Sequence, residues 1–405
     1  MTTMSASTTH ANDVLTTSKP SALDEHFLPS AQSPHLKVEP ATPLEYLQTT
    51  HLNAEEWKGP LDLQQYLERE EVLQQTDLTK DGRITGWILT SDTIPCNPNG
   101  IRPIFASCET IQVCAYVAHK GYIQNVQAHG IASVFTRSEY RGKGYAARMM
   151  VEMGKRLESW QKLEDLSNAF SVLYSDIGPK FYARHGWKVF PSTHIHLALL
   201  GQNDYDRAKG ELPSVEELTM ADLHDIPTVR YVEQRLQEQS TARPNTTFVA
   251  IRPDLEHFGW HIARDEFQCQ LLGKGHPSVK GAIHRETGLA LIWCRVFAAS
   301  EQDWQLHILH TVIPPTIQSS ADAQAAMAAL LSRAQLEASQ WDMVAGVEVW
   351  DPSELTIAAA RTLKAQEQGK VDVITRDKEH LCSLRWNKHD NEDVVWLANE
   401  KYAWC

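Results

Sequence analysis

The sequence lacks an excess of basic residues and lacks long apolar runs. Lys and Arg together number 38 against 51 Asp and Glu in 405 residues, which gives a formal net charge of −13. General binding to nucleic acid or to an anionic membrane surface needs a basic footprint, so we expect neither partner. A membrane-spanning helix needs about 18 or more consecutive apolar residues, and no run in the chain approaches that length. A local basic pocket for a phosphate-bearing ligand remains compatible with this charge.

Cysteines at metal-binding or disulfide spacings are also missing. The seven cysteines include no C-x-x-C pair, so neither a zinc ribbon nor a secreted disulfide framework fits, and we expect no metal. Reduced thiols are typical of a cytoplasmic protein. The first residues are rich in Ser, Thr and Ala and have no apolar signal core. We therefore expect a cytoplasmic chain with a disordered tail over residues 1–35.

The first half predicts alternating helices and strands. Few breakers interrupt residues 45–69, which predicts a helix, and strand-like residues occupy 84–90, 131–136 and 170–174. Apolar residues between 145 and 161 recur at steps of three and four, which predicts one buried helix face. Gly178 and Pro179 then begin a further helix, and Gly186 ends it, because Pro favours the first turn of a helix and Gly the position after its end.

The second half repeats this order. It predicts a strand over 306–313, a helix over 321–341, a strand over 347–350, a helix capped by Asp351, and final strands over 384–386 and 394–397. The polar segment 201–210 separates the halves. We therefore predict an α/β protein with mixed sheets and two lobes: residues 36–200, and residues 201–405, a degenerate copy that closes the substrate pocket.

One short segment carries the chemistry of a phosphate site. The residues Arg-Gly-Lys-Gly-Tyr-Ala occupy 141–146, between the strand that ends at 136 and the helix that follows. The glycines let backbone N–H groups turn toward an anion, and the helix N-terminus adds a partial positive charge. The spacing matches neither a Rossmann site nor a P-loop. A pyrophosphate is the expected occupant, whereas a solvated helix cap is the structural alternative.

The same residues resemble the GCN5-related N-acetyltransferase superfamily. Arg141, Gly144 and Ala146 fill its [RQ]-x-x-G-x-[GA] pattern, and residues 181–187 (FYARHGW) are similar to its F-Y-x-x-x-G-[FW] helix. Residues 107–110, 130–135, 170–182 and 399–405 look like those of the fungal L-lysine N-acetyltransferase family. The resemblance implies the acetyltransferase fold, acetyl-CoA as co-substrate, and transfer of an acetyl group to the side-chain amine of free lysine.

The resemblance also implies which residues bind acetyl-CoA. The strand, the phosphate loop and the turn before the second helix should contact it, through Val134, Phe135, Thr136, Arg141, Gly142, Lys143, Gly144, Tyr145, Ala146, Ser175 and Pro179. Of these, Tyr145 is expected in packing or beside the adenine. Tyr182 is implied as the general acid, because a phenol with an ordinary pKa of about 10 stays protonated at neutral pH.

The general base is left open by the sequence. Superfamily members often carry a Glu eleven residues before the Arg of the phosphate loop, but Gly130 occupies that position here. Three alternatives are Glu109, His129 and the terminal carboxylate of Cys405, which follows apolar residues that would bury well.

The substrate is also open at this stage. Besides free L-lysine, we consider a polyamine, another diamino acid or a protein lysine. With free lysine, the resemblance implies that the reaction would be the first step of lysine catabolism in such fungi. A non-catalytic acetyl-CoA-binding module is the alternative from another class. The oligomeric state is not predicted.

Overall fold

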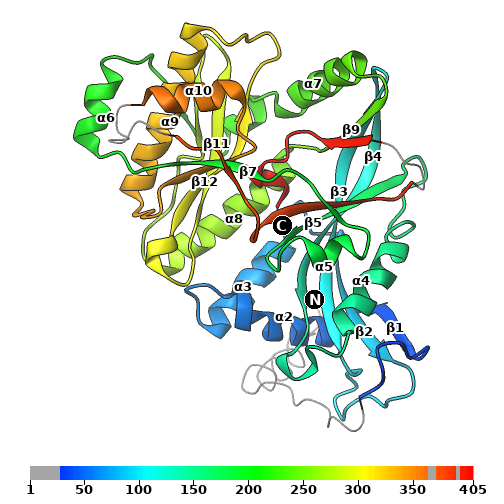
Figure 1. Cartoon of the computed structure of the whole chain (residues 1–405). Helices are drawn as coiled ribbons and strands as arrows, with labels where there is room; N and C mark the ends of the chain where they lie inside the picture. The colour runs from blue at the N-terminus through cyan, green and yellow to red at the C-terminus, as the bar shows by residue number, and fades with distance from the viewer. Residues whose placement is uncertain (1–27, 364–370, 389–392, 405) are drawn as a thin grey trace, which may run out of the picture.

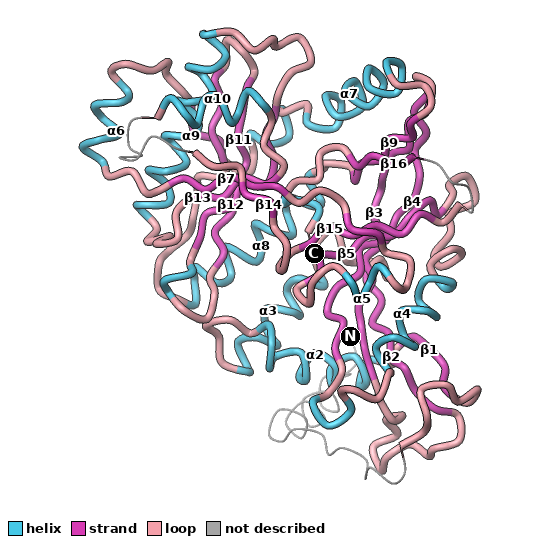
Figure 2. The backbone as a smooth tube through the Cα atoms, in the orientation of Figure 1, coloured by secondary structure: helices cyan, strands magenta, loops and turns pink. Residues whose placement is uncertain are grey.

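Two mixed sheets, each covered by helices, build the protein in two lobes (Figure 1). The computed structural model describes residues 28–363, 371–388 and 393–404. Figure 2 shows the strands of the two sheets as separate groups with helices around them. This arrangement confirms the predicted α/β class with mixed sheets. Within the described residues, no helix is long and apolar enough to cross a membrane.

The first sheet is built mainly from the N-terminal half. Its strand order is β1-β2-β3-β4-β5-β15-β6, with β9 paired to β3 and β16 paired to β9. Their bounds are β1 Leu36–Pro40, β2 Ile84–Ser91, β3 Ala106–His119, β4 Tyr122–Phe135, β5 Asn168–Ser175, β6 Lys188–Val189, β9 Thr246–Ile251, β15 Leu381–Trp386 and β16 Asp393–Trp396. The helices of this half are α2 Pro43–Trp57, α3 Leu63–Gln74, α4 Tyr145–Arg156 and α5 Lys180–Ala183, with the 3-10 turn η2 Ser138–Tyr140.

The second sheet has the order β14-β7-β13-β12-β11-β10-β8. Its strands are β7 Thr193–Leu197, β8 Glu216–Leu218, β10 Gly281–His284, β11 Leu289–Val296, β12 Gln305–Val312, β13 Val347–Trp350 and β14 Ile374–Thr375. The helices of this half are α6 Gln202–Lys209, α7 Thr228–Ala242, α8 Leu255–Leu271, α9 Ala321–Gln340 and α10 Glu354–Thr362, with the 3-10 turns η3 Asp222–Asp225, η4 Glu301–Asp303 and η5 Lys401–Ala403.

The two sheets exchange strands across the predicted boundary at residues 200 and 201. Strand β7 precedes that boundary but pairs with β13 and β14 of the second sheet. Strands β9, β15 and β16 follow it, and they extend the first sheet. A cut at residue 200 would therefore leave unpaired strand edges in both halves, so the lobes are interlocked through their backbones.

Three local expectations differ from the structure. The helix expected over 45–69 is two helices, because Gly59 adopts a left-handed φ of 61° and Asp62 then caps α3 with a capping box. Helix α10 is capped by Ser353 and not by Asp351, whose own φ is 48°. The expected tail included residues 28–35, yet Ala31 is buried in that segment. Residues 1–27 lie outside the described residues.

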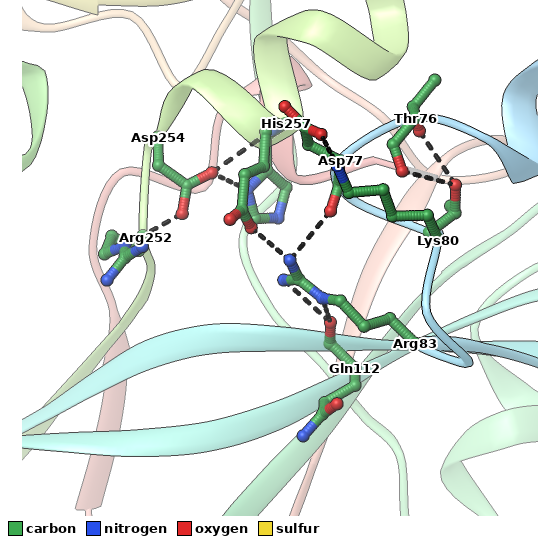
Figure 3. Close-up of polar contacts among 10 residues, drawn as sticks. Thr76, Asp77, Lys80, Arg83, Gln112, Arg252, Asp254 and His257 are labelled. Carbon is green, nitrogen blue, oxygen red and sulfur yellow. Dashed lines mark hydrogen bonds and ion pairs between the residues drawn. The ribbon is translucent and has the colours of Figure 1, made fainter.

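A polar network attaches α8 to the first sheet (Figure 3). Arg83 at the start of β2 donates to the Asp77 carbonyl at 2.9 Å and pairs with Glu256 of α8 at 2.6 Å. Asp254 caps the same helix, and its carboxylate lies 2.7 Å from Nδ1 of His257. These contacts, and the packing of α3 on α8, hold one helix of the second half beside the first sheet.

Candidate active site

The candidate site begins where β4 and β5 separate. The parallel ladder between them ends at the pair Gly130 and Val172, so the following residues of the two strands diverge. Strand β4 is also bulged against β3, between the pairs of Ala132 with Glu109 and of Phe135 with Ser107. Ser133 within this bulge has a φ of 52°. Beyond Gly130, the backbone groups of β4 that faced β5 have no strand partner among the described residues, so they are free to meet a ligand.

A cavity of about 180 Å³ lies at this opening. Its wall joins the two lobes, because β4, β5, α2 and α3 meet α8 and the C-terminal segment there. The residues that line it are Tyr46, Trp57, Tyr66, Arg69, Glu70, Leu73, Gln74, Ile84, Glu109, Ile111, Ile131, Ala132, Ser133, Val134, Leu173, Tyr174, Asp176, Ile177, Tyr182, Trp260, Arg264 and Trp404. Apolar walls with a few charged groups of both signs are typical of a small-molecule site.

The phosphate loop has the backbone that its glycines predict. Gly142 and Gly144 have φ values of 78° and 87°, which side chains other than glycine's rarely allow. Gly144 is the N-cap of α4 and provides no side-chain cap. The first N–H groups of α4 are thus available to an anion. Arg141 is exposed, donates to the Thr136 carbonyl at 3.0 Å and pairs with Glu56 at 2.9 Å.

The other residues expected to bind acetyl-CoA fall into two groups. Val134 lines the cavity, and Thr136 and Ala146 are half-buried near the loop. Exposed Pro179 is the N-cap of α5, while the Ser175 hydroxyl already donates to the Gly178 carbonyl at 2.9 Å. The chain therefore offers backbone groups, more than side chains, to a pyrophosphate and an acyl arm, which fits acetyl-CoA.

Three residues of that set differ in their environment. The Tyr145 side chain is buried, its ring centroid lies 5.0 Å from that of Phe105, and its hydroxyl donates to the Pro29 carbonyl at 2.6 Å. This matches the expected packing role and leaves its side chain unavailable to the adenine. The Phe135 side chain is buried too. Half-buried Lys143 stays a predicted ligand.

Glu109 reaches the cavity from β3. The Tyr46 hydroxyl donates to its carboxylate at 2.6 Å, and the Tyr46 ring lies directly against Gly86, where a Cβ would collide with it. Gly86 pairs with Glu109 across the strands, so a missing side chain on β2 makes room for the phenol. Burial, together with Glu70, raises the pKa of Glu109, while hydrogen bonds from Ser133 and Tyr46 oppose the rise. A carboxylate with a raised pKa in a cavity has the properties of a general base.

Tyr182 lines the same cavity from α5. Its ring is buried against Phe181, with the centroids 5.0 Å apart. Burial raises the pKa of Tyr182 above its usual range, and the nearby thiol of Cys108 adds to the rise. The phenol therefore stays protonated at neutral pH, as an acid for a departing thiolate requires.

The other two candidates for the base are placed differently. His129 lies in the paired part of β4, contacts the side-chain oxygen of Gln161 at 3.3 Å, and is not among the residues that line the cavity. Burial lowers the pKa of His129 to about 4, so the ring is neutral at neutral pH. Cys405 lies outside the described residues.

Sequence motifs missed the charged residues on the other wall of the cavity. Arg69 and Glu70 of α3 and Arg264 of α8 carry no motif, and they reach the site only because α3 packs on α8. Trp404, two residues after Tyr402, closes the wall from the C-terminal segment. The apolar composition of that segment was the one signal that its residues would be buried.

Residues 200–405, just over half of the chain, match the family model described as the LYC1 GNAT-like C-terminal domain. The chain belongs to this LYC1 GNAT-like family. Membership confirms the superfamily that the motifs indicated, with its second, GNAT-like lobe. It also makes the chain an acetyl-CoA-dependent acetyltransferase.

Two curated relatives match most of the length of this chain. An uncharacterized protein of Saccharomyces cerevisiae is 24% identical over 399 residues, which cover 88% of this chain and 94% of the relative. A protein of Yarrowia lipolytica named lysine acetyltransferase is 27% identical over 295 residues, which cover 64% of this chain and 72% of the relative. Both alignments are long enough to include residues of both lobes.

Two solved structures overlap the chain partially. A protein of unknown function from Enterococcus faecalis, titled a probable N-acyltransferase, is 13% identical with a TM-score of 0.48 and covers 87% of this chain and 72% of its own. A GCN5-related N-acetyltransferase from Kribbella flavida is 14% identical with the same TM-score of 0.48, and covers 87% and 71%.

Proposed function

We propose that this protein transfers the acetyl group of acetyl-CoA to the side-chain amine of free L-lysine by direct attack. The observation that carries the proposal is the cavity where β4 and β5 diverge, because Glu109 and Tyr182 line it together. The name of the Yarrowia lipolytica relative supports lysine as the amine. Trp260, Arg264 and Trp404 support the expectation that the second lobe closes the pocket.

In this proposal each catalytic residue handles one proton. Glu109 takes the proton that the lysine ammonium must lose, because an ammonium with an ordinary pKa of about 10.4 is charged at neutral pH and cannot attack. The neutral amine then forms a C–N bond as the thioester C–S bond breaks. The unpaired N–H groups of the β4 bulge face the carbonyl oxygen and stabilise its developing charge. Tyr182 donates its proton to the leaving sulfur, and the second proton, which the attacking nitrogen loses on becoming an amide, restores the Tyr182 phenol.

The loop over 141–146 holds the pyrophosphate in this proposal, with Arg141 and Lys143 as charged partners. Acetyl-CoA supplies the activated thioester when bound. The Arg141 side chain must then exchange Glu56 for a phosphate, and both side chains are exposed enough to do so. We also propose that the reaction takes place in the cytoplasm, since the six cysteines that the structure describes are all free.

A comparison of amines tests the proposal. Steady-state kcat/KM is measured with free lysine, ornithine, spermidine and a lysine-containing peptide, and the product with lysine is analysed by tandem mass spectrometry. We expect lysine to give the highest kcat/KM and a product acetylated on the side-chain amine. Equal or higher kcat/KM with another amine, or acetylation of the α-amine, would overturn the lysine assignment.

A further inference from the structure

Arg264 is a charged side chain of the cavity that the proposed chemistry does not use. It lies on α8 and reaches the cavity wall opposite the diverging strands. Its guanidinium lies over the Trp404 ring, 5.4 Å from the centroid. Within the described residues Arg264 has no hydrogen bond and no ion pair, whereas Arg69 in the same cavity is bonded to Glu70 at 2.8 Å. Among the described residues, the donors of Arg264 are thus left for a ligand.

The charge of this guanidinium makes an anion its natural partner. Burial and the neighbouring charge of Arg69 lower the pKa of Arg264 to about 10, so it is still protonated at neutral pH. A buried charge without a partner is costly, and the planar guanidinium fork matches a carboxylate with two parallel hydrogen bonds. The Trp404 ring contacts the guanidinium from one side as a cation–π partner.

Glu70 complements Arg264 in the same cavity. Glu70 lines the cavity together with Glu109 and Arg264, and its negative charge acts to raise the pKa of both groups. An amino acid carries an α-ammonium beside its α-carboxylate. Of the two Glu70 carboxylate oxygens, Arg69 donates only to Oε1, so the other oxygen can accept from the ammonium while Arg264, in the same cavity, binds the carboxylate. A diamine would leave Arg264 without a partner.

We propose that Arg264 binds the α-carboxylate of the substrate, with Glu70 beside the α-ammonium, so that the enzyme selects an amino acid over a diamine of the same length. The proposal rests on the proposed function, because it assumes that the reacting amine lies near Glu109. It makes Arg264 a specificity-determining residue that takes no part in proton transfer.

The unmodified enzyme provides the first test. Lysine, lysinamide and 1,5-diaminopentane share the reacting amine, but only lysine has a carboxylate. We expect kcat/KM for lysine to exceed that for either analogue by about 10- to 100-fold, the value of hydrogen bonds to a charged partner. Equal values for lysine and lysinamide would overturn the proposal.

The variant Arg264→Met provides the second test, with the exposed Arg361→Met of α10 as its control. Arg264→Met should lower kcat/KM for lysine by about 10- to 100-fold, leave that for 1,5-diaminopentane unchanged, and leave the KM for acetyl-CoA unchanged. Arg361→Met should change none of them. A parallel loss with lysine and with the diamine would overturn the role of Arg264.

The two proposals fail in different ways. If lysine is a poor substrate for the unmodified enzyme and another amine is better, the proposed function fails. If lysine is the best amine but tolerates the loss of its carboxylate or of Arg264, only this inference fails.

Discussion

Each lobe contains a strand–helix–strand unit whose two strands diverge. The lobes differ in whether the opening between these strands is filled by another part of the chain. In the first lobe the unit is β4–α4–β5, and its parallel ladder ends at Gly130 and Val172. In the second it is β12–α9–β13, whose ladder ends at Ile308 and Val349. Both first strands carry a bulge just beyond their last parallel pair, which in β12 lies opposite the step from Ile292 to Trp293 of β11. The duplication expected from the sequence is therefore present in the topology.

The opening in the second lobe is occupied by the chain itself. The turn η5 packs on β12, and the Glu400 carboxylate accepts the Thr311 backbone N–H at 2.7 Å and contacts the His310 ring at 3.1 Å. Thr311 stands three residues beyond the last β12 residue that pairs with β13, just as Ser133 stands three residues beyond the last β4 residue that pairs with β5. The backbone groups that we propose for acyl binding in one lobe thus bind a side chain in the other.

The N-termini of α4 and α9 also differ in whether their backbone N–H groups are already bound within the chain. Helix α4 follows Gly144 and has no side-chain cap, whereas the Ser320 hydroxyl of α9 accepts the Ala323 N–H at 3.2 Å. A capped helix start has satisfied its own donors, so it has less to offer an anion. The comparison teaches that one backbone frame can serve as a site or as a scaffold, depending on whether its unpaired N–H groups are already bound.

The largest expected effect is a loss of activity when Glu109, the carboxylate at the first-lobe opening, is replaced; Glu400 at the second-lobe opening serves as the comparison. Glu109→Gln should lower kcat by about 10²- to 10⁴-fold, the usual contribution of a general base. Because burial raises the pKa of Glu109, activity of the unmodified enzyme should rise as pH increases through that raised value. The variant should lose this acidic limb of the pH profile. Measurements of kcat from pH 5 to pH 9 check both expectations.

The matched control is Glu400→Gln in the second opening. It should keep the acidic limb and instead lower the free energy of unfolding by about 1–3 kcal/mol, because a buried hydrogen-bond acceptor is weakened. Denaturant titration measures this. An acidic limb that disappears with Glu400→Gln and persists with Glu109→Gln would contradict the assignment of the open lobe as the active one.

A smaller effect, on the KM for acetyl-CoA, is expected to distinguish the N-terminus of α4 from that of α9. Arg141→Glu should raise the KM for acetyl-CoA by about 10- to 100-fold, because a charge-assisted contact to phosphate is replaced by repulsion. Ser320→Ala should leave that KM unchanged and lower the free energy of unfolding by about 1 kcal/mol, the usual value of a lost N-cap. An unchanged KM in Arg141→Glu would show that the pyrophosphate lies elsewhere.

The smallest effect concerns Lys401, which lies in the filled opening over the rings of Trp350 at 4.5 Å and Trp404 at 3.8 Å. Burial lowers the pKa of Lys401 to about 7, so between about pH 7 and 10 the folded protein binds fewer protons than the unfolded chain. Stability from this group should therefore rise with pH across that window and be lost as pH falls.

Lys401→Met keeps the length of the side chain and removes its titration. The difference in unfolding free energy between variant and unmodified protein should change steadily from pH 7 to pH 10 and stay constant below pH 7. A difference independent of pH would show that Lys401 is charged in the folded protein throughout.

Most of the secondary-structure elements around the first-lobe opening could be predicted from local sequence. The glycines at 142 and 144, the amphipathic helix after them and the strand over 170–174 were predicted from periodicity and turn chemistry, because these depend on neighbours along the chain. Tyr182, implied by the family resemblance, and Glu109, one of three alternatives for the base, both lie at one cavity in the structure. Boundaries were less accurate, as with the single helix expected over 45–69, where Gly59 and Asp62 divide it.

Local sequence patterns could not predict which residues from opposite halves of the chain lie close together. Arg264 and Glu70 have ordinary places in α8 and α3, and their neighbourhood depends on how these helices pack. The bulge that leaves β4 unpaired and the Gly86 gap that admits Tyr46 are likewise contacts between strands. Likewise, no local pattern indicates that β7 and β15 cross between the sheets.

The sequence by itself therefore indicated the class of chemistry through short segments: a glycine turn before a helix, the Tyr182 phenol, and Glu109 as one of three alternatives for the base. Tertiary structure decided which of two similar frames opens onto a cavity and which charged side chains line that cavity. The physical reason is that φ preferences and helix periodicity act between near neighbours in the chain. Whether the backbone groups of a strand are left unpaired among the described residues, as in β4, or bind Glu400, as in β12, depends on contacts between residues distant in the chain.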